Sequence, residues 1–119
     1  MRTLVLIVDD DERNAKLARD VLERAGMETL TAANAAEGIA TARAHQPTVI
    51  LMDLRLPDLD GATAARRLAD DPATAAIPVV ALSAIPAGEW PPDTAFAGHL
   101  EKPIDVRSFP SLVQSHCRR

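Results

Sequence analysis

The amino-acid sequence predicts a single α/β domain, spanning residues 1–119, in which helices cover both faces of a parallel sheet. The runs Leu4–Val8 and Val49–Met52 are continuously apolar, which is typical of strands buried on both faces in the centre of such a sheet. Segments with helical spacing alternate with strand-like runs, and this order favours crossover helices with right-handed connections. A chain of 119 residues suffices for one two-layer or three-layer core and not for a second.

The first strand, residues 4–8, leads into a helix over residues 13–25. Apolar side chains recur there at helical spacing, and Gly26 supplies the C-terminal stop. Residues 27–31 form a short second strand. The chain therefore begins as a strand, a helix and a strand, the unit from which parallel sheets are built.

The second helix is predicted from a capping box, because Asn34 is followed three residues later by Glu37. It runs to about His45, and Pro47 prevents it from continuing. His45 is expected to be a solvated helix-end residue that interacts favourably with the helix dipole. The third strand, residues 49–52, follows directly.

Asp60 is predicted to cap the third helix, which covers residues 61–69 and is ended by the dipeptide at positions 71–72. The fourth strand is 79–82 and the fifth is 99–101. The last helix is expected to begin after Asp105, as its cap, and to reach toward Cys117 and the tail residue His116.

Composition excludes several classes of function. The formal charge of −4 leaves no basic face for nucleic acid, and no run of Lys and Arg is present. Apolar residues make up 47% of the chain and aromatic residues 3%, so Val, Leu, Ile and Ala must build the core. Cys117 is the only cysteine, which precludes an intrachain disulfide and fits a reducing compartment. No apolar stretch has the length of a membrane span, so we expect a cytoplasmic protein without membrane attachment.

Polar side chains stand at or just after the ends of four predicted strands, and in a parallel sheet these ends meet at one edge. They are Asp9, Asp10, Asp53, Ser83 and Lys102. Three carboxylates so close together repel strongly, and a hard cation held by oxygen atoms relieves that repulsion. Mg²⁺ fits best, because it takes a few carboxylates, keeps part of its water and commonly contacts phosphate. The sequence thus predicts a magnesium site.

The same residues suit phosphoryl transfer to Asp53. A carboxylate is a competent nucleophile for a phosphoryl group. Lys102 adds a compact cation opposite the metal, and the Ser83 hydroxyl can donate a hydrogen bond to an anionic oxygen. Taken singly, each motif has a simpler interpretation. The acidic triplet at 9–11 reads as a polar turn or helix cap, Ser83 as a turn former and Lys102 as a surface-loop residue, so the joint pattern carries the prediction.

The joint pattern resembles the receiver domain of two-component response regulators over nearly the whole chain. The motifs that carry the resemblance are Asp9-Asp10, the spacing of Asp53, Pro57 and Gly61, Ser83-Ala84 and Lys102-Pro103. The resemblance implies a flavodoxin-like fold, with a five-stranded parallel sheet of order 2-1-3-4-5. It also implies that the chain acts in a phosphorelay. We expect no output domain after the last helix, because the segments 10–14 and 77–80 are most similar to single-domain members of the family.

The resemblance assigns roles at the metal site and at the acceptor. Asp53 is implied to be the phospho-acceptor. Asp10 and Asp53 are implied to bind Mg²⁺ directly, together with the backbone carbonyl of Arg55, while Asp9 acts through metal-bound water. Asp58 and Asp60 nearby are interpreted as loop and cap residues instead of ligands.

Further residues are implied to read out the phosphoryl group. Ser83 would be the switch hydroxyl, and Lys102 would pair with the phosphoryl group. His99 stands where members of the family often carry an aromatic switch residue, and it is smaller and titratable. The peptide bond before Pro103 is implied to be cis.

The chain departs from the family pattern between Ser83 and Lys102, where it is shorter by roughly one helical turn. Two prolines and a glycine within residues 87–94 oppose a regular helix. The fourth helix of the family is therefore expected to be shortened or disrupted. Trp90, the only tryptophan, lies in this segment, and both covering the core edge and binding a partner are open to it.

The predicted function is a single-domain response regulator that accepts a phosphoryl group from a histidine kinase or histidine phosphotransfer protein. It would signal through contacts with a downstream protein and stay monomeric. It is not expected to be an enzyme beyond supporting its own phosphorylation and slow self-dephosphorylation.

One alternative is a small Mg²⁺-dependent phosphatase with an aspartate nucleophile, but Arg55 stands where that class needs an acidic Asp. A flavin site is disfavoured because aspartates follow the first strand.

Overall fold

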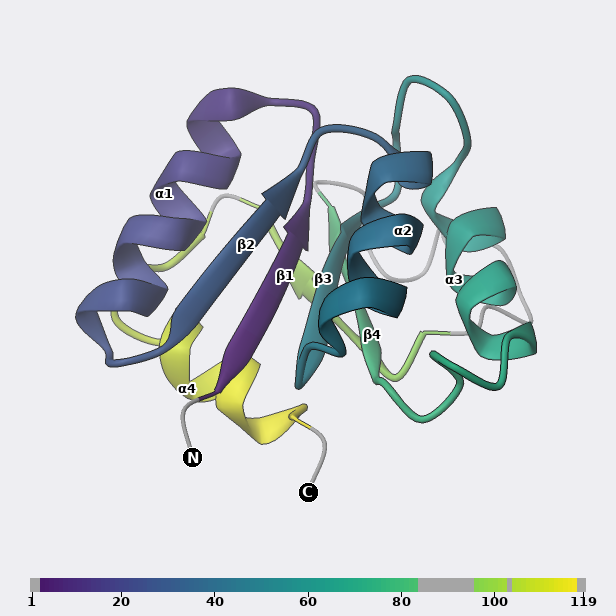
Figure 1. The fold of residues 1–119 in the computed structure, drawn as a ribbon. Helices are drawn as coiled ribbons and strands as arrows, with labels where there is room; N and C mark the ends of the chain where they lie inside the picture. The colour runs from purple at the N-terminus through teal and green to yellow at the C-terminus, as the bar shows by residue number, and fades with distance from the viewer. Residues whose placement is uncertain (1–2, 84–95, 103, 118–119) are drawn as a thin grey trace.

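The computed structural model describes residues 3–83, 96–102 and 104–117, and within them the predicted three-layer arrangement is observed (Figure 1). All strands of the five-stranded sheet run parallel, in the order β2-β1-β3-β4-β5. In chain order the strands are β1 (Leu4–Val8), β2 (Glu28–Ala32), β3 (Val49–Asp53), β4 (Val79–Ser83) and β5 (Gly98–Glu101). The sheet order confirms the flavodoxin-like topology.

The described helices cover both faces of the sheet (Figure 1). They are α1 (Glu12–Arg24), α2 (Ala35–His45), α3 (Gly61–Asp70) and α4 (Phe109–Ser115). The first and last lie on one face and the middle two on the other, and residues Val5–Val8 of β1 are buried between them. Val5 and Ile7 pack toward α1 and α4, while Leu6 and Val8 pack toward α2 and α3. Two buried faces explain why the strand sequence is continuously apolar.

Most element boundaries lie within a residue of those predicted, and the caps explain where the helices begin. Asn34 accepts a hydrogen bond from the Glu37 amide at 2.8 Å, and Asp60 accepts one from the Thr63 amide at 2.8 Å, as predicted. The cap of α1 is Asp11, whose carboxylate accepts from the amides of the following turn. One member of the acidic triplet thus has the simpler role of a helix cap.

The predicted start of the last helix was wrong. Asp105 does accept a hydrogen bond from the Arg107 amide at 3.0 Å, but this bond closes a turn, and α4 begins only at Phe109. Pro110 stands in the first turn of α4, where its missing N–H would have no helical partner in any case. Proline favours the later start.

Two predictions lie outside the described residues. They are the shortened helix within 84–95, with Trp90 in it, and the cis peptide before Pro103. Within the residues that the structure does describe, none of the helices combines the length and the apolar character needed to cross a bilayer.

Candidate functional site

The strand register brings the predicted site residues to one edge of the sheet. Val8 of β1 lies opposite Met52 of β3. The residues that follow them, Asp9 and Asp53, are therefore neighbours at the carboxyl ends of the two strands. Ser83 ends β4 and pairs with Glu101, and Lys102 follows at once. The Lys102 amide donates to the Ser83 carbonyl at 2.9 Å, which extends that pairing by one bond. The prediction that these strand ends converge is confirmed.

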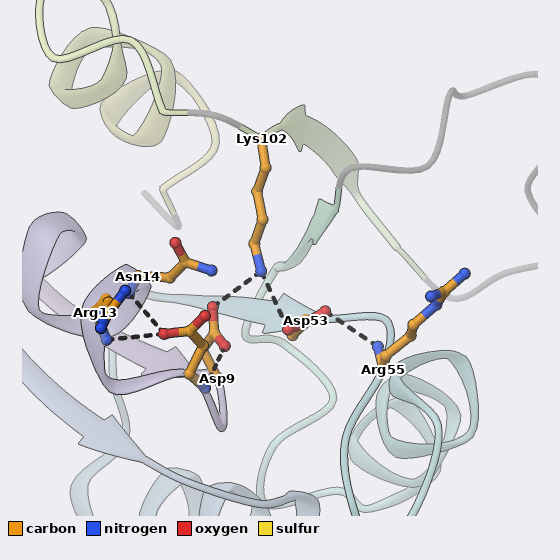
Figure 2. A network of polar contacts seen from close by, with 7 residues as sticks. Asp9, Arg13, Asn14, Asp53, Arg55 and Lys102 are labelled. Carbon is orange, nitrogen blue, oxygen red and sulfur yellow. Dashed lines mark hydrogen bonds and ion pairs between the residues drawn. The ribbon is translucent and has the colours of Figure 1, made fainter.

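Lys102 lies between two carboxylates (Figure 2). Its Nζ donates to Oδ2 of Asp9 and to Oδ2 of Asp53, both at 3.1 Å, and its side chain is only 16% exposed. Burial acts to lower the pKa of Lys102, but hydrogen bonds and charge attraction from the two aspartates together raise it. The ammonium is therefore held charged between the two acids.

Both carboxylate oxygens of Asp53 are engaged. Oδ1 accepts a hydrogen bond from the backbone amide of Arg55 at 3.1 Å, and Oδ2 accepts from Lys102. The residue is 8% exposed at the end of the central strand. Figure 2 shows the Arg55 side chain directed away from the carboxylate, so the amide and not the guanidinium makes this contact. These two bonds hold the carboxylate in one orientation.

Asp9 is 3% exposed, and this burial raises the pKa of its carboxyl group. Hydrogen bonds from the Asp11 amide, at 2.9 Å, and from Lys102 oppose that rise without cancelling it. A raised pKa means that the charged form of Asp9 is less favourable in the folded protein than in the unfolded chain. Additional positive charge at this position would therefore stabilise the protein.

The acidic cluster fits a divalent metal. One carboxylate oxygen each from Asp9, Asp10 and Asp53 can be chosen so that all lie within 4.8 Å of one another, and Asp10 is exposed at the rim. Hard oxygen donors with net negative charge are what Mg²⁺ requires, and an exposed rim leaves room for its water ligands. The role of the Arg55 carbonyl as a further ligand stays a prediction.

Gly61 lets α3 start directly against the backbone of the acceptor residue. Its amide donates to the Leu54 carbonyl at 2.9 Å, and a Cβ at this position would lie 2.2 Å from the Asp53 carbonyl oxygen. No side chain fits at that separation, so the glycine at this spacing after Asp53 has a steric reason.

Sequence reasoning missed one contact near the site. Asp58, interpreted as a loop residue, accepts hydrogen bonds from the amides of Ala35 at 2.9 Å and Ala36 at 3.0 Å, in the first turn of α2. These bonds lower the pKa of the Asp58 carboxyl group. No local pattern around Asp58 indicates this contact, because its partners lie in α2, more than twenty residues earlier in the chain.

The structure describes two of the four predicted switch residues. Ser83 is 4% exposed at the end of β4, on the same edge as Asp53. His99 is exposed on β5. Trp90 and Pro103 lie outside the described residues. The switch roles of these four residues stay predictions.

Comparison with known proteins gives consistent matches. The sequence model described as response regulator receiver domain matches residues 5–114. The polar-differentiation response regulator DivK of Brucella anthropi is 37% identical over 116 residues, which cover 94% of this chain and 94% of that protein.

Solved structures agree with the fold. A sensor protein from Polaromonas sp. superposes with a TM-score of 0.89 at 28% identity, covering 98% of this chain and 96% of that one. The chemotaxis response regulator CheY4 of Vibrio cholerae superposes with a TM-score of 0.90 at 24% identity, covering 97% and 98%. These two likenesses extend over the whole sheet and its helices.

Proposed function

Because the chain belongs to the response regulator receiver domain family, we propose that Asp53 is the residue on which it accepts a phosphoryl group. The protein is a response regulator receiver of a two-component system, of the kind represented by DivK and the chemotaxis regulators. The observation that carries the assignment to Asp53 is its place at the end of β3, with Lys102 and two further carboxylates around it. The phosphatase alternative has no support in these matches.

The residues around Asp53 fit the demands of the transfer. Asp53 supplies the attacking carboxylate oxygen, and the phosphodonor's leaving group departs on the opposite side of phosphorus. The Arg55 amide fixes one carboxylate oxygen, so the other is the one that can attack once Lys102 shifts toward the incoming phosphoryl oxygens. Ser83, on the neighbouring strand end, would donate its hydroxyl to a phosphoryl oxygen.

Mg²⁺ is the proposed cofactor, held by Asp10, Asp53 and the Arg55 carbonyl, with Asp9 contributing through water. When bound, the ion supplies positive charge that offsets the negative charge on the transferred group. Support comes from the three close carboxylates, of which those of Asp9 and Asp53 are buried. The requirement for the ion is tested by labelling with acetyl phosphate in the presence and absence of EDTA.

Lys102→Met is expected to destabilise the protein in metal-free buffer. Removing the ammonium leaves Asp9 and Asp53 without their shared cation, at a cost of roughly 3 kcal/mol. Mg²⁺ should then raise the urea midpoint more in the variant than in the wild type, because the ion no longer competes with a resident cation.

Lys16→Met removes the exposed lysine of α1 and serves as the control. An unchanged metal-free midpoint in Lys102→Met, or the same Mg²⁺ increment in all three proteins, would contradict the proposed role of Lys102.

Self-dephosphorylation is proposed to be slow. In receivers, the side chains two positions after the acceptor and two after the switch hydroxyl border the path of the attacking water. By their place in the sequence these would be Arg55 and Ile85, of which Ile85 lies outside the described residues. Neither can orient that water as a carboxylate or amide would, and Ile85 can shield phosphorus.

Ile85→Glu is expected to speed the loss of phosphate, measured as the decay of labelled protein, whereas Ala69→Glu on the exposed face of α3 should not. A decay constant that is unchanged or smaller in Ile85→Glu would speak against the idea.

The proposed partners are a histidine kinase or histidine phosphotransfer protein as donor and a downstream signalling protein as target. We propose that the protein acts as a monomeric single domain, residues 1–119, in the cytoplasm and without nucleic acid.

Beryllofluoride with Mg²⁺ mimics the phosphorylated state, so binding of both together supports the receiver function. A Trp90 fluorescence change on their addition, with no change in sedimentation, would support a phosphorylation-sensitive contact surface in a monomer.

A further inference from the structure

The carboxylate of Asp58 ties two parts of the molecule together. It belongs to the loop between β3 and α3, residues 54–60, and reaches across to the first turn of α2. Its two oxygens bond separately, Oδ1 to the Ala35 amide and Oδ2 to the Ala36 amide. A carboxylate that accepts two amide hydrogen bonds in this way restrains its own backbone as well as the helix.

The tied loop begins at the acceptor residue. Arg55, two residues after Asp53, donates its amide to Asp53 Oδ1 at 3.1 Å. Leu56 and Leu59 pack partly buried against the core under α2 and α3, and Gly61 closes the base of the loop on Leu54. The Asp58 contact thus attaches the exposed tip of the loop to α2, while apolar packing, the Arg55 and Gly61 amide bonds and the bonds of Asp60 to Thr63 hold the rest of the loop.

We propose that Asp58 is a positioning residue for phosphorylation, which acts by holding the 54–60 loop so that the backbone of Arg55 stays in register with the Asp53 carboxylate. The idea deepens the proposed function of Asp53 and rests on it. Releasing the loop would loosen the Arg55 amide from Oδ1 and displace the neighbouring Arg55 carbonyl. The site would then bind Mg²⁺ more weakly and take up a phosphoryl group more slowly.

A helix cap for α2 is the competing role, and the chain offers a direct way to separate the two. Asn34 also caps α2, through the Glu37 amide at 2.8 Å, but within the part of the chain that the structure describes its side chain makes no hydrogen bond to the 54–60 loop. Asn34→Ala and Asp58→Ala therefore both remove acceptors from the first turn of one helix. Only Asp58→Ala also releases the loop.

The test compares wild type, Asp58→Ala, Asp58→Asn and Asn34→Ala by three measurements. These are amide hydrogen exchange at Arg55, Mg²⁺ affinity by titration calorimetry, and the rate of labelling by acetyl phosphate. Asp58→Ala should speed exchange at Arg55 and reduce both Mg²⁺ affinity and labelling rate by roughly tenfold, the low end of the effect of an outer-shell partner. Asp58→Asn retains one acceptor oxygen and should lie between Asp58→Ala and wild type. Asn34→Ala should match wild type in all three.

The proposal is overturned if Asp58→Ala keeps the wild-type exchange at Arg55 and the wild-type Mg²⁺ affinity, or if Asn34→Ala loses as much as Asp58→Ala. Asp58→Asn keeps the comparison informative should Asp58→Ala fail to fold. Failure of the proposed function gives a different result, because wild-type protein would then take no label. Exchange and Mg²⁺ titration need no phosphorylation, so they decide the role of Asp58 in either case.

Discussion

Replacement of Asp53 by Asn is expected to abolish Mg²⁺-dependent labelling of the protein by acetyl phosphate. The amide keeps the shape of the side chain and can still accept from the Arg55 amide, but it is a poor nucleophile toward phosphorus. It also removes one of the three carboxylates that cluster at the strand ends. Loss of the whole signal is therefore the expected result, measured as incorporated phosphate by intact-protein mass spectrometry.

Two controls define the result. Asp70→Asn, at the exposed end of α3, makes the same chemical change away from the site and should label like wild type. EDTA should prevent labelling of the wild type. Robust labelling of Asp53→Asn, or labelling of the wild type that persists in excess EDTA, would show that another residue or another chemistry is responsible.

Gly61→Ala adds one methyl group, and it is expected to lower the free energy of unfolding more than any other glycine-to-alanine change near the site. The new Cβ would lie 2.2 Å from the Asp53 carbonyl oxygen and 2.8 Å from the Leu54 Cα, so backbone must move. Overpacking against backbone costs about 3 kcal/mol, whereas the gain in helix propensity is at most about 1 kcal/mol. The steric cost should dominate in urea unfolding, and labelling should fall because the displaced atoms belong to the acceptor residue.

Gly26→Ala is the comparison variant, because it separates a steric clash from backbone strain. Gly26 has a φ of +91°, but a Cβ there meets nothing within 4 Å. Its substitution should cost only roughly 1 kcal/mol, from the positive φ alone, and leave labelling intact. If Gly61→Ala is no less stable than Gly26→Ala, the close approach of α3 to Asp53 does not constrain the site as inferred.

Much of the fold follows from the sequence because the strands are buried on both faces. The run at 49–52 has no polar residue, and that pattern alone distinguishes a central parallel strand from a surface one. The last helix was placed wrongly because Asp105 can stabilise either a turn or a helix start, and local sequence does not decide between them. The later start is favoured by Pro110 in the first turn of α4 and by the packing of Phe109 and Val113 into the core.

The candidate site was predictable as a set of residues and not as a set of bonds. Parallel strands must end together, so Asp9, Asp53 and Lys102 had to meet. That Lys102 bridges both acids depends on side-chain geometry that spacing does not contain. The Asp58 contact was unpredictable for a related reason, because its partners Ala35 and Ala36 belong to α2, which is distant from Asp58 in the sequence.

The all-parallel sheet has a consequence for how the chain folds. None of the five described strands pairs with its neighbour through a hairpin. The centre of the sheet forms only when β1 pairs with β3, where Val5 lies opposite Val49. Long-range pairing of this kind slows folding, because loop-closure entropy is lost before the contacts form. Until then the apolar runs of β3 and β4 are exposed and prone to associate between chains. Variants that slow closure of the sheet are therefore expected to lose yield by aggregation during synthesis, even where the folded protein is stable.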